Sequence, residues 1–175
     1  VVVSRTPGFT YNTNLVSAND VPQKVEDVLN PKWRGKIAST PYAASFDRLA
    51  LIWGEEKTTA FLRTFVKHVA GLIRCGEEER VANGEFAMLV FNCDLADANE
   101  MQQKGAPANG RIFKDAGILS YWYLTVPMNS AHPNAAALLA GLLLSKEGQD
   151  ILWKTEKTSS HFVDGTYMNK FVKDQ

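Results

Sequence analysis

Residues 86–91 form an uninterrupted apolar run, which is typical of a strand covered on both faces of a sheet. The segment 55–70 has a different pattern: Phe61, Phe65 and Val69 recur every four residues, as on one face of an amphipathic helix. Short apolar runs and amphipathic segments alternate along the rest of the chain. This alternation predicts an α/β domain with parallel strands between helices.

The predicted strands cover residues 9–12, 36–39, 72–74, 86–91 and 118–126, and the predicted helices cover 25–29, 45–53, 55–70, 77–83, 94–104, 134–144 and 147–154. Ser45 is a candidate N-cap, and Gly54 and Gly105 are expected to end helices. Residues 109–117 are expected to form a loop. The polar tail from residue 155 is expected to lie on the surface.

Charge and hydropathy exclude several classes of protein. Nineteen basic residues balance nineteen acidic ones, so the formal net charge is zero. The chain thus lacks the basic patch expected of a nucleic-acid-binding protein or of one that binds an anionic membrane. Its most apolar run, residues 135–144, is too short to span a bilayer.

The first residues lack the basic start, apolar core and cleavage site of a signal peptide. We therefore expect either a cytoplasmic protein or a chain that begins after its targeting segment. Cys75 and Cys93 do not form a CxxC pair, and no histidine cluster accompanies them. Plain thiols are the favoured interpretation; a disulfide is the alternative in an oxidising compartment.

Catalytic patterns are missing from the sequence. It contains no GxSxG, HExxH or P-loop motif, and nothing in the spacing pairs Cys93 with a histidine as nucleophile and base. The histidines His68, His132 and His161 are scattered, with His68 expected inside the helix 55–70. We predict a protein that is not an enzyme and has no metal site or cofactor.

Six motifs of the sequence are similar to motifs of one protein family and occur in the same order as they do there. They are YNTNLV at 11–16, VEDVLNPKWRGKI at 25–37, VANGEFA at 81–87, KGAP at 104–107, HPNAA at 132–136 and LLSKEGQ at 143–149. Together they resemble the iron(III)-type extracytoplasmic solute-binding proteins that feed ATP-binding-cassette (ABC) importers. The resemblance covers about residues 11–153. Each motif alone also has a structural interpretation, such as helix capping by Gly105.

The resemblance implies an α/β fold: a lobe like that of type II periplasmic binding proteins, with a mixed sheet flanked by helices. It places the second lobe of the receptor at residues 1–115, a crossover strand and helix of the first lobe at 116–150, and a return segment at 151–175. The resemblance also implies that most of the first lobe is absent from this chain. Apolar surface around Leu138, Leu142 and Leu143 is therefore expected to cause self-association.

The family's function implies capture of a small solute between two lobes and its delivery to ABC permease subunits. The expected location is the periplasm, or the outer face of the membrane for a tethered protein. The expected solute is anionic or complexed with a metal. The alternative is a ligand-sensing domain of a receptor or regulator that has the same fold.

The first candidate ligand groups lie in the turn at residues 42–46. The N-terminus of a helix binds anions, and the family uses this small-residue turn for an anionic group of the solute. Ala44, Ser45 and Phe46 are therefore ligand candidates, through the Ser45 hydroxyl and the backbone N–H groups. The alternative is that Ser45 only caps the helix.

Two strand ends and one crossover strand provide the other candidates. Tyr11 and Asn12 end a strand that the family places at the cleft, although Tyr11 is equally expected to pack. Asn92 and Asp94 follow the strand 86–91, and Asp94 is alternatively a helix cap. Family members that bind iron have adjacent tyrosines here, so Cys93-Asp94 argues against tyrosinate binding. On the crossover strand, one residue of 121–123, taken as Tyr121, is expected to line the cleft.

Overall fold

The structure is a computed structural model that describes residues 1–173. It divides the chain into two compact units. One is Thr6–Ile118, and the other combines Val1–Arg5 with Leu119–Gln175. The assignment of these units to the lobes of a receptor stays a prediction.

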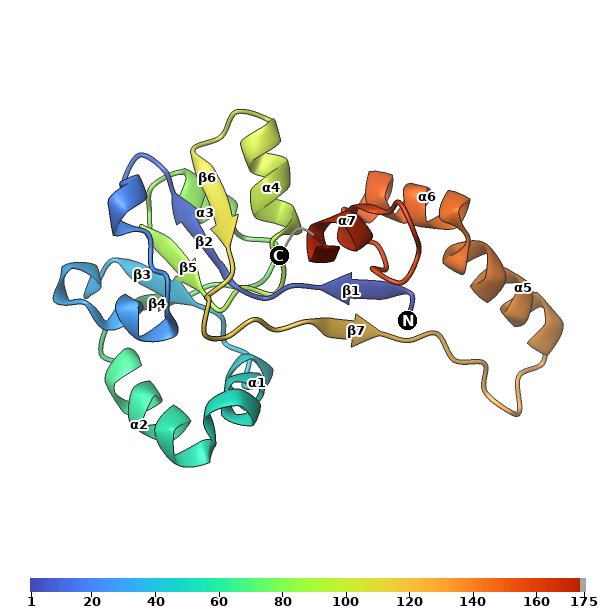
Figure 1. Ribbon diagram of the computed structural model, residues 1–175, viewed down its shortest axis with the longest axis horizontal. Coiled ribbons are helices and arrows are strands. Elements are labelled where there is room, and N and C mark those ends of the chain that lie inside the picture. Colours follow the sequence, from blue (N-terminus) through green and yellow to red (C-terminus); the bar gives the residue numbers. More distant parts are fainter. Residues whose placement is uncertain (174–175) are drawn as a thin grey trace. The chain divides into compact units, whose positions relative to one another are not determined.

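A mixed five-stranded sheet forms the centre of the Thr6–Ile118 unit (Figure 1). Its strand order is β4-β3-β5-β2-β6, with bounds Val69–Leu72, Ile37–Ser39, Met88–Val90, Phe9–Asn12 and Ala108–Arg111. Strand β3 runs parallel to β4 and β5, whereas β2 runs antiparallel to β5 and β6. The predicted mixed sheet flanked by helices is confirmed.

Helices cover both faces of this sheet, as the apolar run of β5 predicts. Side chains alternate along a strand, so Ile37 packs in one core cluster and Ala38 in the other. The larger cluster includes residues of α1 (Ala44–Trp53), α2 (Glu55–Phe65) and the 3₁₀ helices η2 (Val25–Leu29) and η3 (Pro31–Trp33). The opposite face carries α3 (Glu79–Ala82) and α4 (Ala96–Gln103), and the short η1 (Ala18–Asp20) lies after β2.

The start of α1 differs from the prediction. Ala43 is its N-cap residue, and Ser45 lies inside the helix, so the N-cap assignment of Ser45 was wrong. The reason is local: the Ser45 hydroxyl lies near the Thr40 hydroxyl rather than capping backbone amides. The helix ends as expected at Gly54, whose φ of 83° favours glycine.

Of the two outer strands, β4 begins three residues before the strand predicted at 72–74, and β6 was missed. The predicted helix 55–70 ends at Phe65, His68 lies in the following turn, and β4 begins at Val69. Strand β6 occupies part of the segment 109–117 that was expected to be a loop. Gly110 lets α4 pack closely on this strand, because a Cβ there would lie 3.2 Å from the Cβ of Ala98 in α4.

The second unit pairs β1 (Val3–Arg5) antiparallel with β7 (Ser120–Trp122). Its helices are α5 (Pro133–Leu144), α6 (Lys146–Glu156) and α7 (Tyr167–Lys173). The expectation of a surface-lying tail was wrong for residues 158–160, which are buried. The fully buried Gln149 donates to the carbonyls of Val2 and Leu143, and its side chain accepts from the Ser160 amide.

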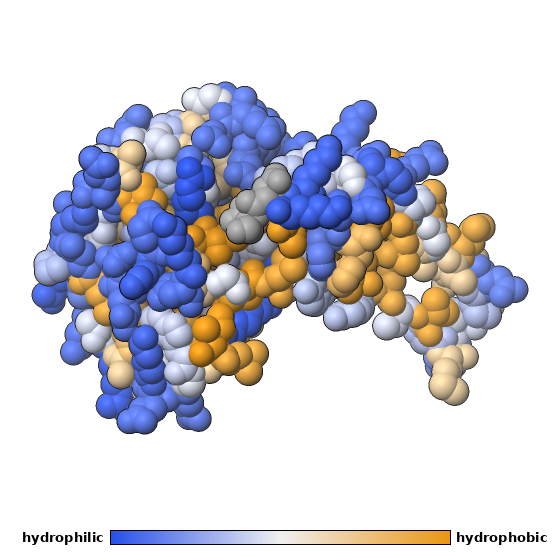
Figure 2. All heavy atoms as spheres, viewed as in Figure 1, coloured by the Kyte–Doolittle hydropathy of each residue, from blue (hydrophilic) through white to orange (hydrophobic). Residues whose placement is uncertain are grey.

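Helix α5 leaves its apolar side chains exposed. It contains no buried residue, and Leu138 and Leu139 are 77% and 56% exposed. Figure 2 shows hydrophobic residues gathered along this helix. None of the helices within residues 1–173 is both long and apolar enough to cross a membrane.

A disulfide joins Cys75 to Cys93, with their Cα atoms 5.8 Å apart. The favoured interpretation of plain thiols was therefore wrong, and the alternative is correct. The two cysteines follow β4 and β5, the two strands that flank β3, so their loops meet at one end of the sheet. Spacing along the chain carries no information about that proximity.

Candidate functional site

The carboxyl ends of β3 and β5 lie at the same edge of the sheet, which is where α/β sheets usually bind ligands. The loop after β3 leads into α1 and brings Ser45 and Phe46 to this edge. The loop after β5 leads into α4 and brings Asn92 and Asp94 there. The structure thus places these predicted site residues at one edge of one unit.

Asn92 holds the loop after β5 in place. It is fully buried; its Oδ1 accepts from the Gly8 N–H at 2.7 Å, and its Nδ2 donates to Thr10 Oγ1 at 2.9 Å. The preceding Phe91 has a φ of 60°, an uncommon value for a bulky residue that turns the chain sharply at this point. Asn92 is therefore a positioning residue in this geometry.

The Ser45 hydroxyl lies 3.5 Å from the hydroxyl of Thr40, and both residues are buried. Thr40 donates its own proton to the Phe91 carbonyl at 3.1 Å. Because a hydroxyl has a single proton, Thr40 acts toward Ser45 only as an acceptor. Its contact with Ser45 is at the long limit of a hydrogen bond, which leaves the Ser45 proton available for a better acceptor.

The backbone N–H groups at the start of α1 are used differently from the prediction. The amides of Ser45 and Phe46 donate to the carbonyls of Tyr42 and Ala43, at 3.3 Å and 2.9 Å. The amides of Ala43 and Ala44 have no acceptor among residues 1–173, and both residues are exposed. The amides that are free to bind an anion therefore lie two residues nearer the N-terminus than predicted.

Arg48 is a candidate that the sequence analysis missed. It is half-buried on α1 and lines a small recess together with Gly8, Ser45 and Phe91. No carboxylate pairs with its guanidinium in the part of the chain that the structure describes. Its position three residues after Ser45 puts both side chains on one side of the helix, and that spacing was the available signal.

Asp94 accepts hydrogen bonds from the Leu95 amide at 2.7 Å and, more weakly, from the Thr6 amide at 3.4 Å. The N-cap residue of α4 is Leu95, so Asp94 is not the helix cap that the sequence suggested as an alternative. The carboxylate instead ties together two loops at the edge of the sheet.

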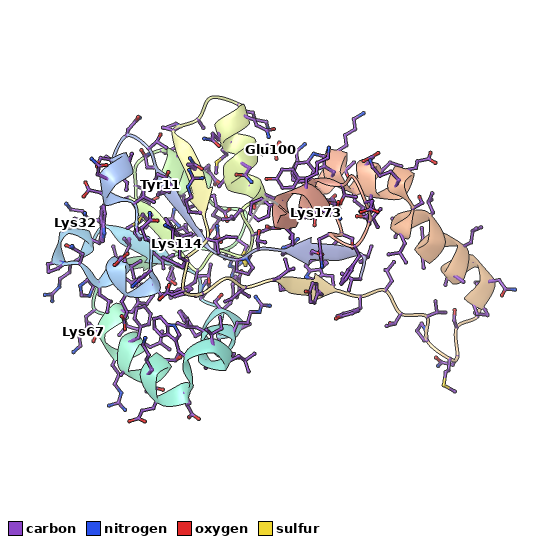
Figure 3. All side chains as sticks on the ribbon, in the orientation of Figure 1. Tyr11, Lys32, Lys67, Glu100, Lys114 and Lys173 are labelled. Atoms are coloured by element: carbon purple, nitrogen blue, oxygen red, sulfur yellow. A yellow bond between two sulfur atoms is a disulfide. The ribbon has the colours of Figure 1, made fainter. Side chains whose placement is uncertain are left out.

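Three predicted site residues lie elsewhere. Tyr11 is buried in the core (Figure 3), and Asn12 donates to the carbonyls of Val81 and Ala82 at 2.8 and 3.0 Å. Because β2 runs antiparallel to β5, both lie at the edge of the sheet opposite Ser45. Tyr121 belongs to the other unit, where its ring stacks on His161 with 5.5 Å between centroids. Ligand binding by these three residues stays a prediction.

The described residues show no preformed metal site. Within residues 1–173, no group of three or more His, Cys, Asp or Glu side chains is arranged to hold a metal ion. Cys93 is held in the disulfide. The edge of the sheet instead offers a guanidinium, a hydroxyl and backbone amides, which are donors suited to an anion.

A family model for the bacterial extracellular solute-binding proteins matches residues 2–173. No curated protein matches the chain significantly in sequence. Among solved structures, the ferric binding protein from Campylobacter jejuni is similar with a TM-score of 0.73 and 16% identity, covering 97% of this chain and 60% of that one.

Two further structures show how varied such proteins are. The periplasmic binding protein AfuA from Actinobacillus pleuropneumoniae, described with fructose-6-phosphate bound, has a TM-score of 0.66 and 22% identity over 90% of this chain and 53% of its own. A two-component system protein that mediates signal transduction has a TM-score of 0.68 and 18% identity, over 90% and 54%. The chain thus spans little more than half the length of these proteins, and at such identities the likeness concerns the fold.

Proposed function

Because this chain belongs to the bacterial extracellular solute-binding proteins, we propose that it forms most of one lobe of a solute receptor for an ABC importer. The receptor captures a small anionic solute between two lobes and passes it to permease subunits in the membrane. It works in the periplasm or tethered to the outer face of the membrane. It binds its solute without catalysing a reaction.

The observation that carries this proposal is the Arg48 guanidinium, which lines the same recess as Ser45 at the carboxyl edge of the sheet and has no acidic partner among residues 1–173. A half-buried guanidinium without an acidic partner favours an anionic ligand, since burial of the cation has already cost hydration. The exposed amides of Ala43 and Ala44 add donors at the positive end of α1. These groups suit phosphate, phosphonate or carboxylate.

The second unit supports a receptor of two lobes. None of the leucines of α5 is buried within the described residues, and the structures similar to this chain are nearly twice as long. We assign the part of residues 1–115 that forms the sheet-bearing unit, from Thr6 onward, to the second lobe, and residues 116–150 to the crossover into a first lobe. In this assignment the remainder of the first lobe covers α5, and residues 151–173 form the return segment.

A second function has one specific observation in its favour. One similar structure is a signal-transduction protein of a two-component system. The same site would then sense an anion rather than deliver it. A transmembrane helix or a regulatory domain in the same natural protein favours sensing, and a neighbouring permease gene favours transport.

The test is a thermal-shift screen of the natural full-length protein with phosphate, phosphonates, organic acids, polyamines and ferric salts. A solute that binds only the folded state raises the melting temperature of the protein by mass action. The proposal expects a shift with one class of anion. It expects Arg48→Gln to weaken that binding by about 10- to 100-fold, the range for a hydrogen bond to a charged group.

The exposed Arg63 on α2 provides the matched control, and Arg63→Gln should leave the affinity unchanged. Ser45→Ala should weaken binding by a smaller factor, because it removes a neutral donor. A shift with polyamines alone would overturn the choice of an anion. A shift with ferric salts that survives Arg48→Gln would favour a metal-complexed solute.

A further inference from the structure

A groove of about 590 Å³ opens beside the turn that precedes α1. Its apolar wall comes from α1, α2 and β4, through Phe46, Leu62, Phe65, Val66, Val69 and Leu72. Its end is formed by residues 39–43, so the groove shares the turn that leads into the candidate anion site. A volume of this size is typical of a pocket for a small molecule.

The groove wall is apolar and partly open to solvent. Val66 and Leu72 are 64% and 62% exposed, which leaves hydrophobic surface in water. The hydroxyls of Ser39 and Thr40 also line the groove, but they donate to the carbonyls of Val90 and Phe91. These hydroxyls therefore have no proton left for a ligand, and the walls favour an apolar group.

The polar groups that remain unused lie at the mouth of the groove. Ala43 lines the groove, and the amides of Ala43 and Ala44 have no acceptor within residues 1–173. An apolar body in the groove would therefore place a negatively charged end group next to unpaired N–H donors. This combination of an apolar pocket and a few convergent donors is typical of a site for an amphiphilic small molecule.

We propose that the solute has an aromatic or branched aliphatic part, which lies in this groove while its anionic group binds at the Ala43–Ala44 turn. This inference rests on the proposed function and adds the chemical class of the solute: an aryl or alkyl carboxylate, or the corresponding phosphonate. Simple inorganic anions fill only the mouth of the site and bind more weakly.

The test is calorimetric titration of the natural full-length protein with two matched series. The first is acetate, butanoate, hexanoate and benzoate, and the second is methylphosphonate and phenylphosphonate. Each additional buried methylene should tighten binding by about fourfold, from the usual value for apolar burial. The increase should stop when the groove is full.

Val66→Asn and Leu72→Asn make the wall polar without adding a charge that would repel the anion. Both should flatten the dependence on chain length while weak binding of acetate and methylphosphonate persists. Leu51→Asn is the matched control, since Leu51 is 87% exposed on α1 and does not line the groove. It should leave both series unchanged.

The outcomes separate this inference from the proposed function. Binding of anions that does not depend on the size of their apolar part overturns the inference and leaves an anion receptor. Failure of every anion, together with binding of another solute, overturns both. If the groove variants change only the sedimentation of the protein, the groove is a protein contact and the inference fails.

Discussion

Asn92 and Thr10 are joined by a hydrogen bond of 2.9 Å in the interior of the sheet-bearing unit, where both side chains are fully buried. The bond links the loop after β5 to the neighbouring strand β2. Together with the bond from the Gly8 amide, it fixes the sharp turn at Phe91 beside the candidate anion site. We therefore expect Asn92 to contribute to stability and, if the proposed anion site is correct, to ligand binding as well.

Replacing Asn92 with Ala leaves the Gly8 amide and the Thr10 hydroxyl without their buried partner. We expect a loss of about 1–3 kcal/mol in the free energy of unfolding, the usual cost of an unsatisfied buried group. Urea unfolding followed by circular dichroism measures this change. The control is Gln102→Ala on the exposed side of α4, which should stay within about 0.5 kcal/mol of the wild type. An equal loss of unfolding free energy in both variants would contradict a positioning role for Asn92.

The disulfide between Cys75 and Cys93 should stabilise the fold by limiting the unfolded chain. The two cysteines are 18 residues apart, and closing a loop of that size contributes about 3 kcal/mol. Unfolding with and without a reductant should show this difference. The Cys75→Ser/Cys93→Ser double variant should match the reduced protein and be insensitive to reductant. A wild type that shows no response to reductant would contradict the prediction.

The buried carboxyl group of Glu78 should make the stability of the fold depend on pH in an unusual way. Burial raises the pKa of Glu78 to about 7, and nearby Asp97 adds to the effect. Its Oε2 accepts from the Gly76 amide at 2.8 Å, whereas Oε1 has no partner among the described residues. The folded state thus keeps a proton that the unfolded chain releases near pH 4.5, so stability falls as the pH rises from about 4.5 to 7.

The size of this effect is up to about 3 kcal/mol, since each pKa unit corresponds to about 1.4 kcal/mol. Glu78→Gln should remove most of this decline and make the protein more stable than the wild type above pH 7. Glu56 on α2 is exposed and is not among the charges that shift the pKa of Glu78, so Glu56→Gln serves as the control and should keep the wild-type profile. Unfolding midpoints from pH 4 to 8 provide the measurement. A Glu78→Gln profile parallel to that of the wild type would argue against the raised pKa.

The exposed leucines of α5 predict self-association of the 175-residue chain on its own. Leu138 and Leu142 are 77% and 47% exposed, and contiguous apolar surface of this kind promotes contact between copies. Sedimentation velocity should show species larger than a monomer. The double change Leu138→Lys/Leu142→Lys should return the chain to a monomer, whereas Leu51→Lys in the other unit should not. A wild-type chain that stays monomeric at every concentration would refute this prediction.

The edges of the sheet show why part of the fold escaped the sequence analysis. Val69 continues the four-residue spacing of Phe61 and Phe65, so local periodicity extended the helix through it. In the structure Val69 pairs with Ile37 of β3 instead, a contact between residues far apart in the chain. Residues 108–111 have little apolar character, and only their hydrogen bonds to β2 make them a strand. Backbone pairing of this kind leaves almost no trace in the local sequence.

The sequence by itself predicted the elements that depend on local physical chemistry. These are the apolar run of β5, the amphipathic face of α2 and the helix end at Gly54, because each depends on neighbours within a few residues. The order of the six motifs indicated the family. Only the tertiary structure decided which polar groups meet. It joined Cys75 to Cys93, placed Asn12 at the edge away from Ser45, and left Arg48 beside Ser45 without an acidic partner among residues 1–173, because such distances depend on how the whole chain packs.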